Sequence, residues 1–235
     1  MHMRGKGGIG LLRLACAAIV AAMFLAGPAP EIAAADIDDA QATVERARLA
    51  FGGFMRDENY SWMHEHLKDA KGVLIYPQVL KGGFIFGGSG GTGVLLVRED
   101  KAGDFGSPAF YTVGSVSFGL QIGGESAEVV MLVMSQKGID SLLTSKFKLG
   151  GDASIALGPV GGGAKGDITA DFISFAKSKG LYAGLNLDGS YLGVRDDLNK
   201  AYYGKEATPA DIIIRRSVSN KDADRLREEL RKALK

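Results

Sequence analysis

The sequence predicts an α+β fold: a glycine-rich, mostly antiparallel β-sheet or barrel-like core, flanked by N- and C-terminal helices. From residue 71 onward, short apolar runs alternate with clusters of glycine, which is the pattern of strands joined by turns. On both sides of this region, apolar residues recur at steps of three and four, which is typical of amphipathic helices. No stretch is suited to act as a long linker, so we expect residues 36–235 to form a single domain.

The first 35 residues are typical of a secretory signal peptide. Basic residues come first, among them Arg4 and Arg13, and an uncharged apolar run follows at residues 14–25. Three alanines at 33–35 then fit the small-residue cleavage pattern just before Asp36. The apolar run spans about a dozen residues, whereas a membrane-spanning helix needs roughly 20. We therefore expect export, with cleavage after residue 35.

The composition of residues 36–235 narrows the class of partner. These residues include 25 Lys and Arg against 26 Asp and Glu, so their net charge is near −1. A globally basic balance is absent, and we therefore expect no nucleic acid as a partner. The one cysteine of the chain, Cys16, lies inside the apolar run, so we expect neither lipidation there nor thiol chemistry in the exported part. Any attraction to an anionic surface must come from a local patch.

Helices are predicted at both ends of the exported part. Residues 36–55 have apolar side chains at three- and four-residue steps, with charged residues between them. Residues 60–70 form a second, shorter candidate. Near the other end, Thr208 and Pro209 are typical of a helix start, because the hydroxyl accepts a bond from a free amide and the proline needs no N–H there. A final helix is expected over residues 220–234.

The strands are predicted from apolar runs bounded by glycines. A connecting helix over residues 136–143 separates two sets of them. The first set comprises residues 73–76, 83–86, 94–97, 110–113, 115–121 and 128–134, and the second comprises residues 147–157, 167–175, 181–185 and 190–194.

Residues 88–93 match the dinucleotide-binding pattern GxGxxG, which is weak on its own. The pattern holds a pyrophosphate only where a helix follows at once, because the phosphates bond to free amides at the helix N-terminus. Here the next residues, 94–97, are a predicted strand. We therefore interpret the glycines as a tight bend between strands. The glycine-rich segment 158–166 resembles a phosphate loop only in composition, since it lacks the Gly-Lys-Ser/Thr ending.

Residues 36–235 give little indication of catalysis or of a cofactor. His64-Glu65-His66 is the metal-like cluster, but side chains two residues apart on a helix point in different directions. A solvated helix face is the better interpretation. Only two histidines follow the expected cleavage site, which leaves a hydrolase triad without support. We therefore expect no metal, no cofactor and no enzymatic activity.

The residues best suited to binding lie near the second predicted helix. They are Trp62, His66, Lys68, Lys71 and Lys81. A tryptophan beside lysines is typical of a membrane interface, where the ring lies at headgroup depth and the ammonium groups meet phosphates. The alternative is that Trp62 packs in the core and the lysines only keep the surface soluble.

Residues 215–235 form a second candidate patch. They carry eight basic residues against four acidic ones. This excess favours a binding role, but the tail helix is also consistent with a solvated surface helix that binds nothing.

A series of short motifs across the chain is similar to one known family. They are Ala-Lys-Gly-Val at 70–73, Gly-Gly-Phe-Ile-Phe-Gly at 82–87, Gly-Val-Leu-Leu-Val-Arg at 93–98, Ser-Pro-Ala-Phe at 107–110, Gly-Leu-Gln-Ile-Gly-Gly at 119–124, Lys-Leu-Gly-Gly-Asp-Ala at 148–153, Leu-Gly-Pro at 157–159, Gly-Leu-Tyr-Ala-Gly at 180–184, and 199–204 ending in Tyr-Tyr-Gly. Each motif is short, but their order and spacing together resemble the SYLF family, also called the yeast-type actin-binding domain family. The resemblance covers about residues 69–204.

The resemblance implies a non-catalytic lipid-binding domain. Eukaryotic members bind phosphoinositides through a basic N-terminal segment, which His66, Lys68 and Lys71 match in position, and some also bind actin. The sequence departs from the family at Phe105-Gly106, where a tryptophan usually precedes Ser-Pro, and at Gly91-Thr92, where some relatives have a lysine. Bacterial members are typically exported proteins.

An exported bacterial member would ordinarily meet neither actin nor phosphoinositides. We therefore expect a periplasmic or cell-envelope protein whose ligands are anionic phospholipids or lipid phosphates, such as those of lipopolysaccharide. The alternative is a protein-interaction or structural module that docks an envelope protein without binding lipid. Salt separates the two, because binding through lysines weakens as ionic strength rises and an apolar protein interface responds little.

Overall fold

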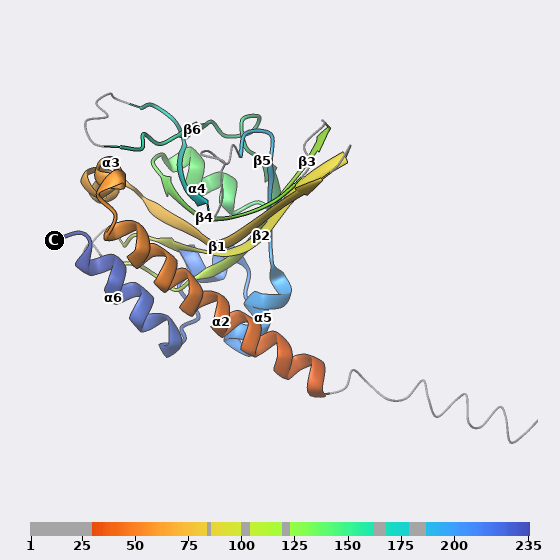
Figure 1. Ribbon diagram of the computed structural model, residues 1–235. Coiled ribbons are helices and arrows are strands. Elements are labelled where there is room, and N and C mark those ends of the chain that lie inside the picture. The colour runs from red at the N-terminus through yellow and green to blue at the C-terminus, as the bar shows by residue number, and fades with distance from the viewer. Residues whose placement is uncertain (1–29, 84–85, 100–103, 119–122, 162–167, 179–186) are drawn as a thin grey trace, which may run out of the picture.

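A computed structural model describes residues 30–83, 86–99, 104–118, 123–161, 168–178 and 187–235 (Figure 1). An eight-stranded sheet forms the centre, in the order β5-β8-β3-β2-β1-β4-β7-β6. Neighbouring strands are antiparallel except for β6 and β7, which are parallel. Helices at both ends of the chain flank this sheet, so the predicted α+β class is confirmed. The predicted strand 181–185 lies outside the described residues.

The strands differ strongly in length. Four long ones form the middle of the sheet, and four shorter ones complete its two sides. Their bounds are β1 Gly72–Gly83, β2 Phe86–Val97, β3 Ala109–Phe118, β4 Gly123–Val133, β5 Lys146–Lys148, β6 Ile155–Leu157, β7 Phe172–Ser178 and β8 Tyr191–Val194.

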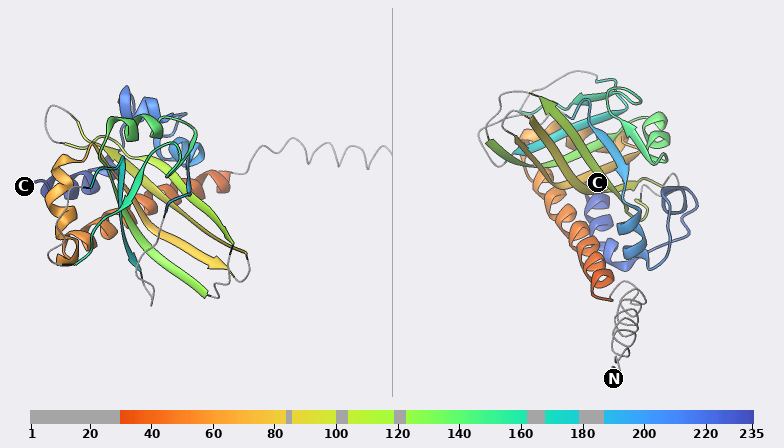
Figure 2. Two further views of the ribbon diagram at one scale, coloured as in Figure 1. Left: turned by 90° about the horizontal axis from the view of Figure 1, so that it is seen from above. Right: turned by 90° about the vertical axis from the view of Figure 1, so that its right-hand side faces the viewer.

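The sheet is curled into a half-barrel (Figure 2). Strands β5 and β6 stand at its opposite edges, yet only residues 149–154 join them along the chain. Lys148 and Ile155 are seven residues apart. Seven extended residues reach at most about 25 Å, so the two edges must approach one another. A bridge between Leu149 and Ala153 tightens this connection further.

Helices α2 (Pro30–Met55), α5 (Asp196–Tyr203) and α6 (Asp224–Lys232) cover one face of the sheet, whereas helix α4 (Gln136–Leu142) packs on the other. Helix α2 runs across strands β1, β2 and β4, and helices α5 and α6 pack beside it (Figure 1). Ala40, Val44 and Phe51 bury the apolar side of α2, as their spacing predicts. The remaining helical elements are short. They are η1 Glu58–Tyr60, α3 Ser61–His66, η2 Leu67–Asp69, η3 Ala210–Ile214 and η4 Lys221–Ala223.

The side chains of the central strands alternate between two separate hydrophobic cores. Val73 and Ile75 of strand β1 join the core under the helices, whereas Leu74 and Tyr76 join the core inside the curled sheet. Successive side chains of a strand point to opposite faces, so both faces are buried here. This explains why strand β1 begins with an unbroken apolar run.

Several predicted strands have different bounds in the structure. The predicted strand 147–157 is two strands, β5 and β6, because the chain turns at Gly150 (φ 78°) and Asp152 accepts a bond from the Lys148 N–H. The predicted strands 110–113 and 115–121 are one strand, β3. The predicted strand 167–175 begins later, at Phe172 in β7.

The interpretation of residues 88–93 as a tight bend was wrong. These residues lie in the middle of strand β2, paired with β1 and β3. A Cβ on Gly93 would lie 2.3 Å from the Ile75 carbonyl oxygen and 2.6 Å from Cδ1 of Tyr76. A bulge in strand β1 between Ile75 and Gln78 brings the two strands this close. Glycine is needed here for close packing, not for a turn.

Candidate functional site

Trp62 does not lie on the surface. Its side chain is 6% exposed and belongs to the core under the helices, 6.0 Å from the ring of Phe175. The His66 ring stacks on it at 3.7 Å and 8°, and His66 Nδ1 lies 2.8 Å from the Trp62 carbonyl oxygen. The expectation that Trp62 anchors the protein in a membrane is therefore wrong, because its ring is already covered by protein.

The two histidines of the His-Glu-His cluster face different partners. His64 Nε2 lies 3.0 Å from the carbonyl oxygen of Phe54, whereas His66 contacts Trp62. Throughout the described residues, no three His, Cys, Asp or Glu side chains gather where they could hold a metal ion. The cluster ties the α3 segment to the rest of the fold.

Lys68 and Lys71 do stand together on the surface, and a third cation joins them. Both lysines are exposed. Arg98, at the end of strand β2, donates its backbone N–H to the Lys71 carbonyl at 2.8 Å and a guanidinium N–H to the Lys68 carbonyl. Within the described parts of the chain, these three cations have no ion pair, and the only acid between the two lysines is Asp69. We call Lys68, Lys71 and Arg98 the basic group.

Lys81 is remote from this group. It lies ten residues beyond Lys71, near the opposite end of strand β1, which is about 30 Å at roughly 3.3 Å per residue. Its strand neighbours are Ser89 and Glu125. The structure therefore separates Lys81 from the other predicted binding residues.

Arg98 was missed as a binding residue. It is 27 positions beyond Lys71 in the chain, and only the pairing of Gly72 with Val97 brings the two together. The apolar runs at 73–76 and 94–97 indicate two strands, but they do not fix which residues are opposite each other. The register would have been needed to find Arg98.

Some basic side chains of the C-terminal tail make contacts inside the protein. Leu226 and Leu230 bury one side of helix α6. Arg227 donates to the carbonyl of Phe105 at 2.6 Å, and Lys232 pairs with Glu228 at 3.0 Å. These contacts favour the interpretation that the tail helix is part of the fold.

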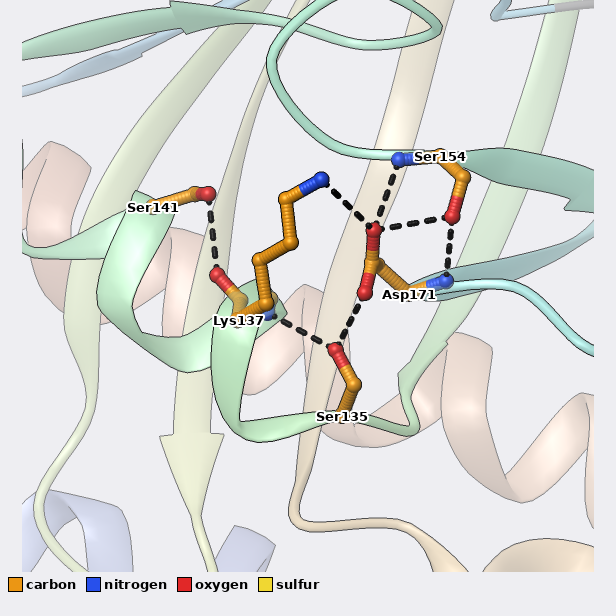
Figure 3. A network of polar contacts seen from close by, with 6 residues as sticks. Ser135, Lys137, Ser141, Ser154 and Asp171 are labelled. Carbon is orange, nitrogen blue, oxygen red and sulfur yellow. Dashed lines mark hydrogen bonds and ion pairs between the residues drawn. The ribbon is translucent and has the colours of Figure 1, made fainter.

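A polar network connects helix α4 with strands β6 and β7 (Figure 3). The Asp171 carboxylate accepts bonds from the Ser135 hydroxyl and from the Ser154 N–H and hydroxyl, both at 2.8 Å, and Lys137 Nζ lies 3.7 Å away. Burial raises the pKa of Asp171, but the hydrogen bonds from Ser135 and Ser154 and the charge of Lys137 outweigh it, so the pKa lies below its usual value. Ser135 also accepts the Gly138 N–H at the start of α4. The network has a structural role, because it holds the start of helix α4 against the segments that precede strands β6 and β7.

Ser89 is part of a formal Gly-x-Ser-x-Gly pattern, residues 87–91, which our sequence interpretation missed. A nucleophile of that kind sits on a sharp turn from a strand into a helix. Ser89 instead lies within strand β2, with its oxygen 2.8 Å from the oxygen of Ser115. The geometry does not match a hydrolase nucleophile.

The model of a known family matches the second half of the chain. The sequence model of the Ysc84 family, described as "Las17-binding protein actin regulator", matches residues 114–233, from strand β3 to just beyond helix α6. This is half of the chain. The chain belongs to the Ysc84 family. The resemblance to the SYLF family is thereby confirmed.

Several eukaryotic proteins are similar to this Ysc84-family chain. An SH3 domain-containing protein of Schizosaccharomyces pombe is 36% identical over 154 residues, which cover 63% of this chain and 35% of the relative. Protein YSC84 of Saccharomyces cerevisiae is 34% identical over 157 residues, 63% of this chain and 32% of the relative. The SH3 domain-containing YSC84-like protein 1 of Mus musculus is 29% identical over 149 residues, which cover 61% of this chain and 43% of the relative.

This Ysc84-family chain spans about a third of the length of the fungal relatives. No solved structure gives a significant match. In the described part of the chain, no helix is both long and apolar enough to cross a membrane. The family description and the name of one yeast relative, LAS seventeen-binding protein 3, describe binding or regulatory proteins, which is consistent with a non-catalytic module.

Proposed function

We propose that this Ysc84-family chain binds anionic membranes peripherally, through Lys68, Lys71 and Arg98. The observation that carries the proposal is the convergence of three cations from two segments of the chain, with no ion pair among the described residues to neutralise them. Free cations on a surface are attracted to a negatively charged leaflet, at about 1 kcal/mol for each Lys or Arg. The guanidinium of Arg98 adds the geometry that suits phosphate oxygens.

The proposal extends to the compartment. With export after residue 35, the protein would face the periplasm or cell envelope, where anionic phospholipids and lipid phosphates are the available ligands. The near-neutral net charge of residues 36–235 means that the attraction must be local. The basic group is such a local feature.

Reversing two of these charges tests the proposal. We expect Lys68→Glu with Lys71→Glu to weaken binding to anionic vesicles by well over tenfold, since each reversed charge changes the interaction by about 1 kcal/mol or more. Co-sedimentation with neutral and anionic vesicles at two salt concentrations measures this. Circular dichroism shows that the variant stays folded, as expected for exposed positions.

The matched control reverses two lysines elsewhere. Lys205 and Lys221 are also exposed. Lys205→Glu with Lys221→Glu changes the net charge of the protein by the same amount as Lys68→Glu with Lys71→Glu. If the control weakens binding as much as Lys68→Glu with Lys71→Glu, net charge matters and the basic group does not. If neither pair of substitutions changes vesicle binding, the proposed site is wrong.

A second candidate function is a protein-binding module. The family description "Las17-binding protein actin regulator" and the names of the relatives favour it. In this case we expect wild-type protein to leave anionic vesicles unbound at low salt, while an envelope protein co-purifies with it at high salt.

A further inference from the structure

Where the long strands extend beyond helix α2, at the upper right of Figure 1, one face of the sheet is covered by none of the described helices. Cross-strand neighbours on this face form a row that runs from strand β1 to the edge strand β5. The row is Leu80, Gly90, Gly114, Tyr191 and Lys148. Gly90 is an even number of residues from Val94 and Leu96, which belong to the core under the helices. All three therefore lie on the same face of strand β2, and the row continues the face that the helices cover elsewhere. We call it the open face.

The open face combines exposed apolar side chains with cations. Val116 is 80% exposed, Leu80 55% and Tyr191 45%. Lys146 Nζ and Lys148 Nζ stand 4.6 and 5.9 Å from the centre of the Tyr191 ring. A solvated sheet face ordinarily carries polar residues at such positions. An aromatic ring flanked by lysines is the pairing that the sequence suggested at Trp62, and here it is on the surface.

The charged side chains at the Tyr191 end of the open face are cations, whereas Glu128 of strand β4 lies on the same side of the sheet near the Leu80 end. The row itself contains no acidic residue, and Glu125 of strand β4 pairs with Lys81 on the other face of the sheet. The nearest acid to the lysines along the chain is Asp152, whose carboxylate accepts the Lys148 N–H at 2.8 Å. A partner that complements this face has negative charges beside an apolar layer.

Glycine occupies two positions at the centre of the open face, Gly90 and Gly114. A Cβ on Gly90 would meet the Val113 carbonyl oxygen at 3.8 Å, and one on Gly114 would meet that of Ser89 at 3.8 Å, both ordinary contacts. Packing within the protein therefore does not require glycine at either position. Without side chains there, the exposed Leu80, Val116 and Tyr191 protrude beyond the backbone between them.

We propose that the open face is a second membrane-contact surface, whose partner is a bilayer containing anionic lipid. Lys146 and Lys148 bind lipid phosphates, the Tyr191 ring lies at headgroup depth, and Leu80 and Val116 reach the boundary of the acyl chains. The inference rests on the proposed lipid binding and adds a surface to it. Charge complementarity together with the exposed apolar side chains selects a bilayer over a soluble phosphate, which would leave the apolar residues in water.

The test compares two faces of one strand. Cys16 is the only cysteine, so Cys16→Ala with Val116→Cys allows a single environment-sensitive fluorophore on the open face of the full chain. Cys16→Ala with Ser115→Cys places the same fluorophore on the opposite face, one residue away. With anionic vesicles, we expect a blue shift at 116 and none at 115. Lys146→Glu with Lys148→Glu should weaken vesicle binding more than tenfold.

The outcomes separate the two proposals. If wild type binds vesicles, Lys68→Glu with Lys71→Glu weakens binding, and neither Lys146→Glu with Lys148→Glu nor the fluorophore at 116 responds, the open face is not a membrane surface and the proposed function stands. If wild type binds no anionic vesicles, both proposals fall. A shift at 116 that depends on protein concentration without vesicles would show that a second copy covers the face, and would overturn the bilayer as its partner.

Discussion

The long strands have a half that the helices cover and an uncovered half, over which no described helix lies, and the two halves use glycine for different reasons. In the covered half, around residues 72–76, 94–97 and 129–133, helices bury one face and the curled sheet buries the other. In the uncovered half, around residues 80–83, 87–90 and 114–118, glycine and serine replace most of the apolar residues, while Leu80 and Val116 remain. The two halves meet where strand β1 bulges between Ile75 and Gln78.

Strand β2 shows both uses of glycine within a few residues. Gly91 and Gly93 face the β1 bulge, where a Cβ would lie 2.3 Å from a backbone oxygen in each case. Gly90 faces the other way, with ordinary space for a side chain. Glycine at 91 and 93 is therefore explained by packing inside the protein. Glycine at 90 is not, and an external surface is the explanation that we propose.

The largest expected effect is at Gly93. We expect Gly93→Ala to lower the free energy of unfolding by about 3 kcal/mol, because the new methyl would collide with the Ile75 carbonyl oxygen and the Tyr76 ring, and overpacking of a tight core typically costs about 1–3 kcal/mol. Urea unfolding followed by the emission of Trp62, the one tryptophan and a buried one, measures it. A variant as stable as wild type would show that the bulge is not as tight as described.

The second effect concerns the Asp171 network. The Asp171 carboxylate accepts hydrogen bonds from Ser135 and Ser154, and the residue is only 9% exposed. Asp171→Asn replaces this carboxylate with an uncharged amide. Hydrogen bonds to charged groups contribute about 1.5–3 kcal/mol, so we expect a loss of about 2 kcal/mol at neutral pH. Thr208, which bonds Asp211 on the exposed surface, provides the control: Thr208→Ala should cost less.

The same variant gives a test by pH. The pKa of Asp171 in the folded protein is below its ordinary value of 3.8, so its contribution is fully present above that value and is lost as the pH falls through the folded pKa. The stability difference between wild type and Asp171→Asn should therefore be constant from pH 7 to about 5 and shrink below about pH 4. A difference that grows on acidification would contradict the lowered pKa.

Local patterns of apolar residues in the sequence predicted most of the helices and strands of the covered half. The spacing of apolar residues located helix α2 and the side that it buries, and the runs at 73–76, 94–97 and 190–194 located strands. Helix α5 was missed, because its buried side includes the polar Asn199, whose side-chain oxygen accepts the Phe110 N–H at 3.0 Å. That contact joins residues 89 positions apart and leaves no local trace.

The candidate site was less predictable than the fold. The cue that suggested a membrane anchor, an aromatic ring beside lysines, does not say which ring is exposed. Trp62 is covered by His66 and the core, while Tyr191 is exposed because it lies near the edge of the sheet. Strand order decides this exposure, and strand order depends on pairings between distant segments. The binding residues predicted from the sequence did not include Arg98 for the same reason.

The smallest expected effect is the most direct test of the difference between the two halves. Gly90→Ala makes the same chemical change as Gly93→Ala, three residues away on the same strand but on the opposite face. Because the new methyl has room, and glycine in a strand is less stable than alanine by about 0.5–1 kcal/mol, we expect a gain of roughly 0.5 kcal/mol in the free energy of unfolding. Urea unfolding under the conditions used for Gly93→Ala measures it. A loss as large as that of Gly93→Ala would mean that packing inside the protein also requires Gly90. Glycine at position 90 would then need no external partner to explain it.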